Sequence, residues 1–183
     1  MGIQAKGFTL VELMVVLALL AITMAFAVPN FIEMIANNRI SSSTSDFIGA
    51  LQLAKAESAA RVTPVTICKK NSASTACVVG ALVGWEQGWI VFTDADASGS
   101  VDPGDTVLHA HEALNPRITF KGTAGVTDLI TYTPSGATSI NGIEILMMCD
   151  DRGFSASALG VLITITGRGN ALKAENTGET TCL

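Results

Sequence analysis

The sequence has little positive charge. Eleven Lys and Arg residues stand against 16 Asp and Glu residues, which gives a formal net charge of −5 and an estimated pI of about 4.9. A chain with this balance has no broad positive field that would attract polyanions such as nucleic acids. Any contact with DNA would therefore have to be local.

Motifs for catalysis are also missing. The sequence contains no nucleotide-binding glycine loop, no nucleophile elbow and no metalloprotease helix. Its four cysteines lack the Cys-x-x-Cys spacing of zinc sites. They are even in number and all follow the first apolar run, which favours disulfides formed outside the cytoplasm. We therefore expect no enzyme activity, no cofactor and no metal.

Between Phe8 and Val28 the sequence has almost no charge. This run has 21 residues, and Glu12 is the charged one among them. About 20 helical residues cross the hydrocarbon core of a bilayer, so the run predicts a transmembrane helix over residues 8–28. A secretory signal peptide is disfavoured because no Ala-x-Ala cleavage site follows. A buried core helix is the alternative, but the run lacks the periodicity of one.

Glu12 is the unusual feature of this run. A carboxylate near the centre of a membrane costs about 2.5 to 3.5 kcal/mol, and less near an end, so such a group normally has a partner. Lys6 is the nearest cation in the sequence, and it lies outside the span. Cleavage between Gly7 and Phe8 would create an α-amine that another copy of the chain could present to Glu12.

The segment "GFTLVEL", followed by the apolar stretch and Pro29, resembles the class III signal of type IV pilins and type II secretion pseudopilins. The resemblance implies that residues 1–7 are a leader, that a prepilin peptidase cleaves after Gly7 on the cytoplasmic side, and that the new Phe8 amine is methylated. It also implies that Glu12 pairs with the N-terminus of a neighbouring subunit during assembly. The chain would then be a single-pass inner-membrane protein with a cytoplasmic N-terminus and a periplasmic C-terminal domain.

We expect the helix to continue past Pro29 over residues 29–62. Proline would kink a helix, yet apolar and small residues resume after it. A stripe then recurs at intervals of four and three, which places it on one helical face that packs against the downstream domain: Ile40, Thr44, Phe47, Leu51, Ala54 and Ser58. The segment "RVTP" should end the helix, since a residue before proline avoids helical geometry.

Residues 63–183 show the pattern of an all-β domain. Short β-branched runs alternate with Gly, Asn, Asp and Ser, which is typical of a sandwich or barrel. We predict seven strands at 65–68, 89–93, 106–109, 118–121, 130–132, 143–149 and 159–166. The expected fold class is α+β, with a long N-terminal helix packed on an antiparallel β-sandwich as in pilins.

Four cysteines allow three connectivities. Cys68 and Cys77 flank a polar, turn-like segment, so a bridge between them would clip a short loop to the preceding strand. Cys149 and Cys182 would then join the C-terminal tail to a central strand. We favour these two pairs.

A second resemblance extends over most of the chain. The segment "GWEQGWIVFTDADASGSVDPGD", with "VTIC" before it and "GRG" near the end, resembles the H-type minor pseudopilins and their minor-pilin relatives. It implies a low-copy subunit that primes or caps a type IV pilus or a type II secretion pseudopilus. Its partners would be other minor and major pilins or pseudopilins, the prepilin peptidase and the inner membrane. The choice between the two machines stays open.

Two further segments carry metal-ligand residue types. The segment "DADASGSVDPGD" has nearly the spacing of a calcium loop, with oxygens at Asp94, Asp96, Ser98, Asp102 and Asp105. Such residues also make ordinary turns, because their side chains bond to nearby backbone. His109 and His111 would share a face of an extended strand, but no third ligand is near, which favours surface or partly packed histidines.

The C-terminal segment "TGRGNALK" resembles a Gly-Arg-x-Arg motif that some minor pilins of this family use to bind DNA during natural transformation. Gly167 and Arg168 match the motif, and Asn170 stands at the position of the second arginine. The alternative function is therefore DNA uptake, with Arg168 and Lys173 as a sparse DNA-binding patch. The structural interpretation is a Gly-rich turn between two C-terminal strands.

Overall fold

The computed structural model describes three ranges of the chain: 7–80, 83–155 and 157–182. The chain divides into two compact units between Asn38 and Arg39. Helix α1 (Leu10–Arg61) has residues in both units and contains Pro29. The prediction that the helix continues past this proline is confirmed, as is its end at the "RVTP" segment.

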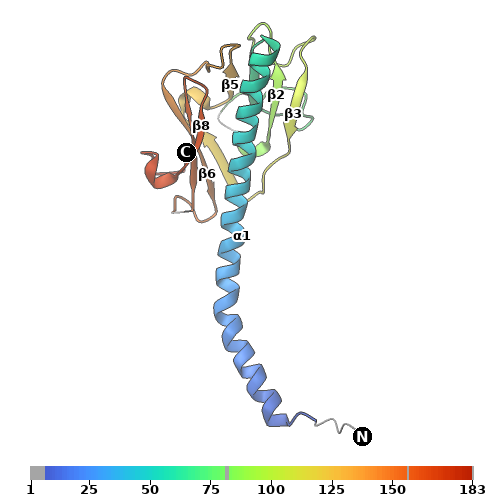
Figure 1. Ribbon diagram of the computed structural model, residues 1–183, viewed down its shortest axis with the longest axis vertical. Coiled ribbons are helices and arrows are strands. Elements are labelled where there is room, and N and C mark those ends of the chain that lie inside the picture. The colour runs from blue at the N-terminus through green and yellow to red at the C-terminus, as the bar shows by residue number, and fades with distance from the viewer. Residues whose placement is uncertain (1–6, 81–82, 156, 183) are drawn as a thin grey trace. The chain divides into compact units, whose positions relative to one another are not determined.

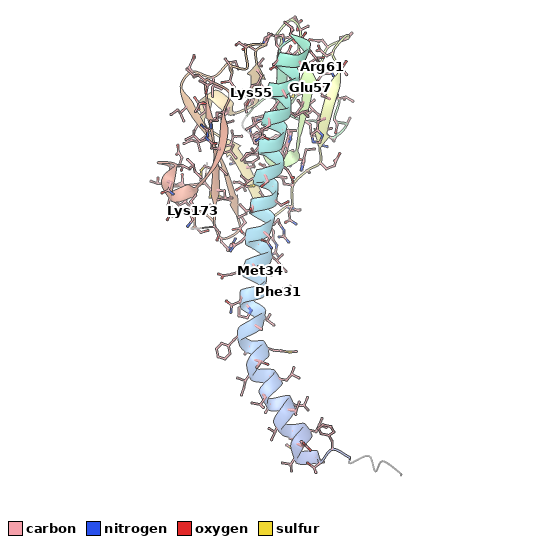
Figure 2. The ribbon with its side chains drawn as sticks, viewed as in Figure 1. Phe31, Met34, Lys55, Glu57, Arg61 and Lys173 are labelled. Carbon is pink, nitrogen blue, oxygen red and sulfur yellow. A yellow bond between two sulfur atoms is a disulfide. The ribbon has the colours of Figure 1, made fainter. Side chains whose placement is uncertain are left out.

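In the first unit, the side chains of α1 have no core to pack against. The described residues of this unit are exposed almost throughout. Two large apolar side chains that follow the proline, Phe31 and Met34, are 58% and 50% exposed (Figure 2). The apolar surface of this unit therefore extends beyond Val28.

In the second unit, one face of α1 is buried. The predicted stripe is confirmed, since all six of its members are buried: Ile40, Thr44, Phe47, Leu51, Ala54 and Ser58. The Phe47 ring lies edge-on to three other rings, with centroid distances of 5.3 Å to Trp85, 5.1 Å to Trp89 and 4.8 Å to Phe120. Each such contact adds about 0.5–1.5 kcal/mol beyond the burial of apolar area.

The C-terminal end of α1 carries a strained residue. The Thr63 amide donates to the Ser58 carbonyl at 3.3 Å, as in a Schellman motif. Val62, between them, has a φ of 53°, in the left-handed region that favours glycine. The side chain of Val62 is 76% exposed, so packing against the described residues does little to offset this strain.

Eight strands follow the helix in the described part of the chain and form two antiparallel sheets. The first sheet has the order β3-β2-β1-β5 and the second has the order β4-β6-β7-β8 (Figure 1). The strands are β1 (Val65–Lys69), β2 (Trp89–Thr93), β3 (Val107–His111), β4 (Ile118–Gly122), β5 (Leu129–Tyr132), β6 (Ile143–Asp150), β7 (Leu159–Thr164) and β8 (Gly169–Lys173). The sequence predicts the first seven with ends shifted by at most two residues; it gives no bounds for β8, which is implied only by the predicted turn between two C-terminal strands.

The second-unit part of α1 shares one core with the inner faces of both sheets. Trp89 of β2, Ile130 of β5, Leu146 of β6 and Val161 of β7 belong to the same apolar cluster as Phe47. In Figure 1, β2 and β3 lie on one side of this part of α1, and β6 and β8 lie on the other. The predicted α+β fold class, with a long helix packed on an antiparallel β-sandwich, is therefore confirmed.

Each disulfide holds a segment against the outer face of one sheet. Cys68 bonds to Cys77 and Cys149 bonds to Cys182, which are the pairs favoured from the sequence. The first bond lies in an outer cluster formed by Cys68, Ile90 and Phe92 with Cys77, Val101 and Leu129. The second lies in a cluster formed by Ile145, Met147, Cys149, Ala158 and Ala174 with Cys182. We call residues 174–182, which cover this second outer face, the C-terminal strap.

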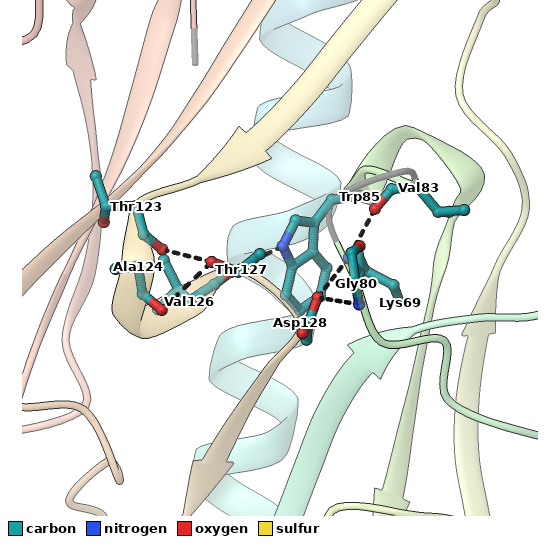
Figure 3. Close-up of polar contacts among 9 residues, drawn as sticks. All are labelled: Lys69, Gly80, Val83, Trp85, Thr123, Ala124, Val126, Thr127 and Asp128. Atoms are coloured by element: carbon teal, nitrogen blue, oxygen red, sulfur yellow. Dashed lines mark hydrogen bonds and ion pairs between the residues drawn. The ribbon is translucent and has the colours of Figure 1, made fainter.

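A buried lysine joins three segments of the domain. Lys69, at the end of β1, donates from Nζ to the carbonyls of Gly80 and Val83 at 2.8 and 2.6 Å (Figure 3). Its Nζ also lies 2.6 Å from Asp128 Oδ1. The same carboxylate oxygen accepts the Gly80 amide at 3.1 Å. Because this buried charge is paired and hydrogen-bonded, Lys69 has a structural role.

Candidate functional site

Gly7 and Phe8 are exposed and lie in the non-helical segment 7–9 that precedes α1. A Cβ on Gly7 would meet no atom within 4 Å among the described residues, so the Gly7–Phe8 peptide bond is uncrowded there. The rest of the predicted leader, residues 1–6, lies outside the described residues. An exposed, non-helical bond has the geometry that proteolysis requires.

Glu12 lies in the first turn of α1. The Glu12 amide donates to Thr9 Oγ1 at 3.2 Å, and the spacing Thr-x-x-Glu is that of a capping box. A carboxylate in the first turn also interacts favourably with the helix dipole. These contacts place Glu12 within one turn of the Phe8 amine that cleavage would create. Among the described residues of the single chain, Glu12 has no cationic partner.

The part of α1 that holds the apolar run has the properties of a membrane span. Among the described residues, α1 has the length and the apolar composition that a helix needs to cross a membrane. None of the residues in its most apolar window is buried. An apolar surface of this size is normally covered by lipid or by protein.

A second candidate site is a groove of about 330 Å³ in the second unit. It is lined by Leu51, Gln52, Lys55, Gly167, Arg168, Gly169 and Asn170. Lys55 Nζ donates to the Thr166 carbonyl at 2.8 Å, so the lysine is held against the β7–β8 turn beside Arg168. We call this groove the basic notch.

Two glycines shape the turn that carries Arg168. Gly167 has a φ of 73°, and a Cβ there would collide with the Gly136 carbonyl and the Tyr132 ring. At Gly169, a Cβ would lie 2.6 Å from Leu51 of α1. Glycine is needed at position 167, where φ is positive and a backbone carbonyl lies close, whereas at position 169 a larger residue would have to displace the end of the Leu51 side chain. The predicted Gly-rich turn between two strands is confirmed, and it leaves Arg168 exposed.

The structure does not bring Lys173 to Arg168. Arg168 immediately precedes β8 and Lys173 is its last residue, so the two are roughly 17 Å apart along five extended residues. Instead, Lys173 Nζ lies 3.8 Å from Glu175 Oε1. In Figure 2, Lys55 lies near the C-terminal end of α1, and Lys173 lies far from it. The sequence alone did not identify Lys55 as a site residue. The only local signal was its position next to Ala54, a member of the buried stripe.

The aspartate-rich loop is organised by Asp94. This buried carboxylate accepts the Thr66 hydroxyl at 2.7 Å, the Ser98 amide at 2.9 Å and the Gly99 amide at 3.1 Å. Its oxygens therefore bind the loop to β1 and close a turn. This geometry matches the ordinary-turn interpretation of the segment.

The other oxygens of the loop bond to one another. Ser98 Oγ donates to Asp102 at 2.8 Å, and the Asp102 amide donates to Asp105 at 2.9 Å. In the described ranges, no group of three or more His, Cys, Asp or Glu side chains is placed to hold a metal ion. Asp96, Asp102 and Asp105 line a cavity of about 250 Å³ at the surface.

The two histidines lie at the edge of the first sheet. They pair with Val91 and Trp89, whose side chains face the core, so both lie on the same face of β3 as predicted. The His111 ring stacks on Trp89 with a centroid distance of 4.0 Å, and its Nε2 lies 3.7 Å from Asp46. His111 is thus a packed histidine, whereas His109 is exposed.

Two family models match the chain. The model for prokaryotic N-terminal methylation motifs matches residues 4–28, and the model for type II transport protein GspH matches residues 43–169. No match was found among curated proteins.

Two crystal structures of the type IV minor pilin FimU from Pseudomonas aeruginosa have a similar fold. Their TM-scores are 0.60 and 0.56, at 18% and 17% sequence identity. The matches cover 80% and 78% of this chain and 96% and 99% of the FimU chains. At such identities the likeness shows the fold alone, but the GspH model matches more than half of the chain. The chain therefore belongs to the family of type II transport protein GspH.

Proposed function

We propose that the chain is a low-copy minor pilin or pseudopilin that primes or caps a type IV pilus or a type II secretion pseudopilus. The supporting observation is that one chain combines the N-terminal methylation motif, at the start of an apolar helix, with the GspH region over residues 43–169. The subunit has a structural role and no catalytic one. Its partners are other minor and major pilins or pseudopilins.

Maturation begins at the exposed Gly7–Phe8 bond. A prepilin peptidase cleaves this bond and methylates the Phe8 amine. Residues 8–28 span the inner membrane, with the N-terminus in the cytoplasm and the β domain in the periplasm. The same span lets the mature subunit leave the bilayer and enter the fibre, where neighbouring helices cover its apolar surface.

Glu12 carries the assembly contact. Its amide is satisfied by Thr9, but the charge of its carboxylate has no counterpart among the described residues. A charged carboxylate at membrane depth is stabilised by a cation, and the amine of Phe8 in a neighbouring subunit supplies one. Pairing in trans thus favours the polymer over the isolated subunit in the membrane.

The test compares Glu12→Leu with Glu33→Leu in the native host, because both acids lie on α1 and are exposed. Membrane fractionation should find both variants inserted as the wild type is. Sheared or secreted fibres should contain the Glu33→Leu variant at the wild-type level and at least ten-fold less of the Glu12→Leu variant. Equal incorporation of the two variants would refute the pairing.

DNA uptake is the second candidate function, and the lysine beside Arg168 favours it. Lys55 supplies a second cation where the motif lacks its second arginine. Gel-shift titration of the full chain in detergent tests this function. A DNA-uptake function requires that the chain binds duplex DNA in a salt-dependent way and that Arg168→Ala abolishes this binding. Absence of binding at low salt would exclude the function.

A further inference from the structure

Three of the strands at the sheet edges in the described part of the chain are covered or protected. At β5, the Ser139 amide donates to the Thr131 carbonyl at 2.9 Å, so the chain itself covers this edge. At β4, the Phe120 amide donates to the Glu86 carboxylate at 3.1 Å. Strand β8 ends on the exposed Lys173, a charge of the kind that keeps an edge from pairing.

The remaining edge strand, β3, has no such protection. Its sequence, VLHAH, contains no Lys, Arg, Asp, Glu or Pro, and three of its residues are exposed: Val107, His109 and Ala110. Among the described residues, no hydrogen bond joins its backbone to any segment other than β2. In Figure 1, β3 is the outermost strand on its side of the domain. An exposed edge of this kind is a template for pairing with another strand.

The register of the sheet shows that the backbone groups of Ala110 point outward. The Lys70 amide of the β1 side donates to the Gly88 carbonyl at 3.1 Å, and backbone groups along a strand alternate between its two neighbours. This alternation turns toward β3 the two β2 residues that pair with His109 and His111. Ala110 lies between these histidines, so its N–H and C=O are directed away from β2 and are free to bond to an added strand.

A groove of about 340 Å³ lies beside this edge, between β3 and α1. Strand β3 contributes His109 and His111 to its lining, and α1 contributes Asp46 and the small residues Gly49 and Ala50. Both histidines lie on the core-facing side of β3. Because side chains alternate between the two faces of a sheet, every second side chain of a strand added at this edge would point into the groove.

Asp46 gives the groove its charge. Its side chain is 51% exposed, and its ion-pair partner in the described residues is His111, whose Nε2 lies 3.7 Å away. His111 Nδ1 lies 2.7 Å from the Glu112 carbonyl oxygen, which can only accept, so Nδ1 carries the ring proton. In a neutral ring Nε2 then has no proton to donate to Asp46. The carboxylate is therefore free to bind a cation that enters the groove.

We propose that β3 accepts an extended segment of a different pilin or pseudopilin subunit, and that a lysine or arginine of this segment binds Asp46 in the groove. Main-chain hydrogen bonds to Ala110 supply affinity, and the side chain in the groove supplies specificity. A second copy paired through the same edge fits poorly, because β3 carries no Lys or Arg to meet Asp46. The edge takes one strand and is then closed, which agrees with a low-copy subunit. The inference rests on the proposed function, because it names a partner within the fibre.

The experiment titrates the isotope-labelled full chain in detergent with a short capped peptide, in which threonine and valine alternate around one central lysine. A second peptide has glutamate in place of the lysine. Ala110→Pro removes the outward N–H, and proline is tolerated at an edge where the N–H faces solvent. Its matched control, Ala110→Val, keeps the N–H. Asp46→Asn removes the charge and keeps the shape of the side chain, and circular dichroism verifies the fold of each variant.

Nuclear magnetic resonance follows hydrogen exchange of single amides. In the free chain, the Ala110 amide should exchange faster than the His109 and His111 amides, which bond to β2. The lysine peptide should slow exchange at Ala110 and bind roughly ten-fold more tightly than the glutamate peptide, because Asp46 attracts the one charge and repels the other. Ala110→Pro should abolish binding, and Ala110→Val should bind as the wild type does. Asp46→Asn should bind the two peptides about equally.

The variants are also compared in the native host. Fibres should contain the Ala110→Val variant at the wild-type level and roughly ten-fold less of the Ala110→Pro variant, because loss of the edge contact removes a subunit interface. Equal incorporation of these two variants would overturn the proposal. A chain that is absent from fibres even as the wild type would instead overturn the proposed function.

Three results with the peptides would also overturn the inference: exchange at Ala110 that the lysine peptide does not slow, equal binding by Ala110→Pro and Ala110→Val, or equal binding of the two peptides to the wild type. A wild-type dimer in sedimentation equilibrium that Ala110→Pro abolishes would make the occupant a second copy, and would overturn it too. The peptide measurements need no fibre, so their failure leaves the proposed function and the pairing of Glu12 untouched.

Discussion

Breaking the disulfide of the C-terminal strap should destabilise the second unit more than breaking the other disulfide. The Cys149–Cys182 bond closes a sequence separation of 33 residues, and the Cys68–Cys77 bond closes one of 9. In the chain-entropy model, loops of these lengths correspond to about 4 and about 3 kcal/mol of stability. Cys182→Ser and Cys77→Ser are the suitable changes, because each alters the partly exposed cysteine and leaves its buried partner in place.

The strap makes the first change more severe. The Ala174 amide donates to the Ala158 carbonyl at 3.0 Å, and the Thr177 hydroxyl lies 3.8 Å from Met147 Sδ. Gly160 allows this approach, since a Cβ there would lie 2.5 Å from a Thr177 methyl. A strap released by Cys182→Ser would lose these contacts and expose apolar side chains of β6. The loss of about 4 kcal/mol is therefore a lower estimate for this variant.

Guanidinium unfolding of the full chain in detergent provides the assay. Trp85 and Trp89 are both buried in the shared core, so tryptophan fluorescence reports on the fold of the second unit. The free energy of unfolding should fall by about 3 kcal/mol in Cys77→Ser and by about 4 kcal/mol or more in Cys182→Ser. A loss below about 1 kcal/mol in Cys182→Ser, or a larger loss in Cys77→Ser, would refute this account of the strap.

Three further predictions concern single side chains. Phe47→Ala should lower the free energy of unfolding by about 3–5 kcal/mol, because it removes a fully buried ring that contacts three others; a loss under about 1 kcal/mol would contradict this packing. Val62→Gly should raise the free energy of unfolding by about 1 kcal/mol by relieving left-handed strain, and a destabilised variant would argue against strain at this residue. Burial raises the pKa of the Tyr132 phenol, so the native state keeps a proton that the unfolded chain loses. The contribution of Tyr132 to stability should therefore be constant below about pH 10 and fall above it, and Tyr132→Phe should weaken the loss of stability at alkaline pH. Because Tyr132 is the single tyrosine of the chain, tyrosinate absorbance follows it directly, and ionisation near pH 10 before unfolding would contradict its burial.

Features set by local sequence were predictable. The length and composition of residues 8–28 indicate a span, and the intervals of three and four between Ile40 and Ser58 identify the buried face of α1. The helix end at "RVTP" follows from the geometry that proline imposes on the preceding residue. Each of these inferences depends on residues within a few positions of one another.

Features set by distant contacts were not predictable. Strand β8 contains Gly169 and Asn170, which have low strand propensity, and it forms because β7 supplies its hydrogen-bond partners. Lys55 lies beside Arg168 through a bond to a carbonyl 111 positions away. Asp94 resembled a metal ligand because its spacing does not reveal that Thr66 and two amides occupy its oxygens.

The mass of the mature chain tests the central claim most directly. The chain is expressed with a prepilin peptidase, extracted from membranes and measured intact by mass spectrometry, with a Gly7→Val variant as the control. We expect the mass of residues 8–183 with both disulfides and one added methyl group, located at Phe8 by fragmentation, and no cleavage in the variant. A chain that retains residues 1–7 beside an active peptidase, or that begins at any residue other than Phe8, would contradict the account.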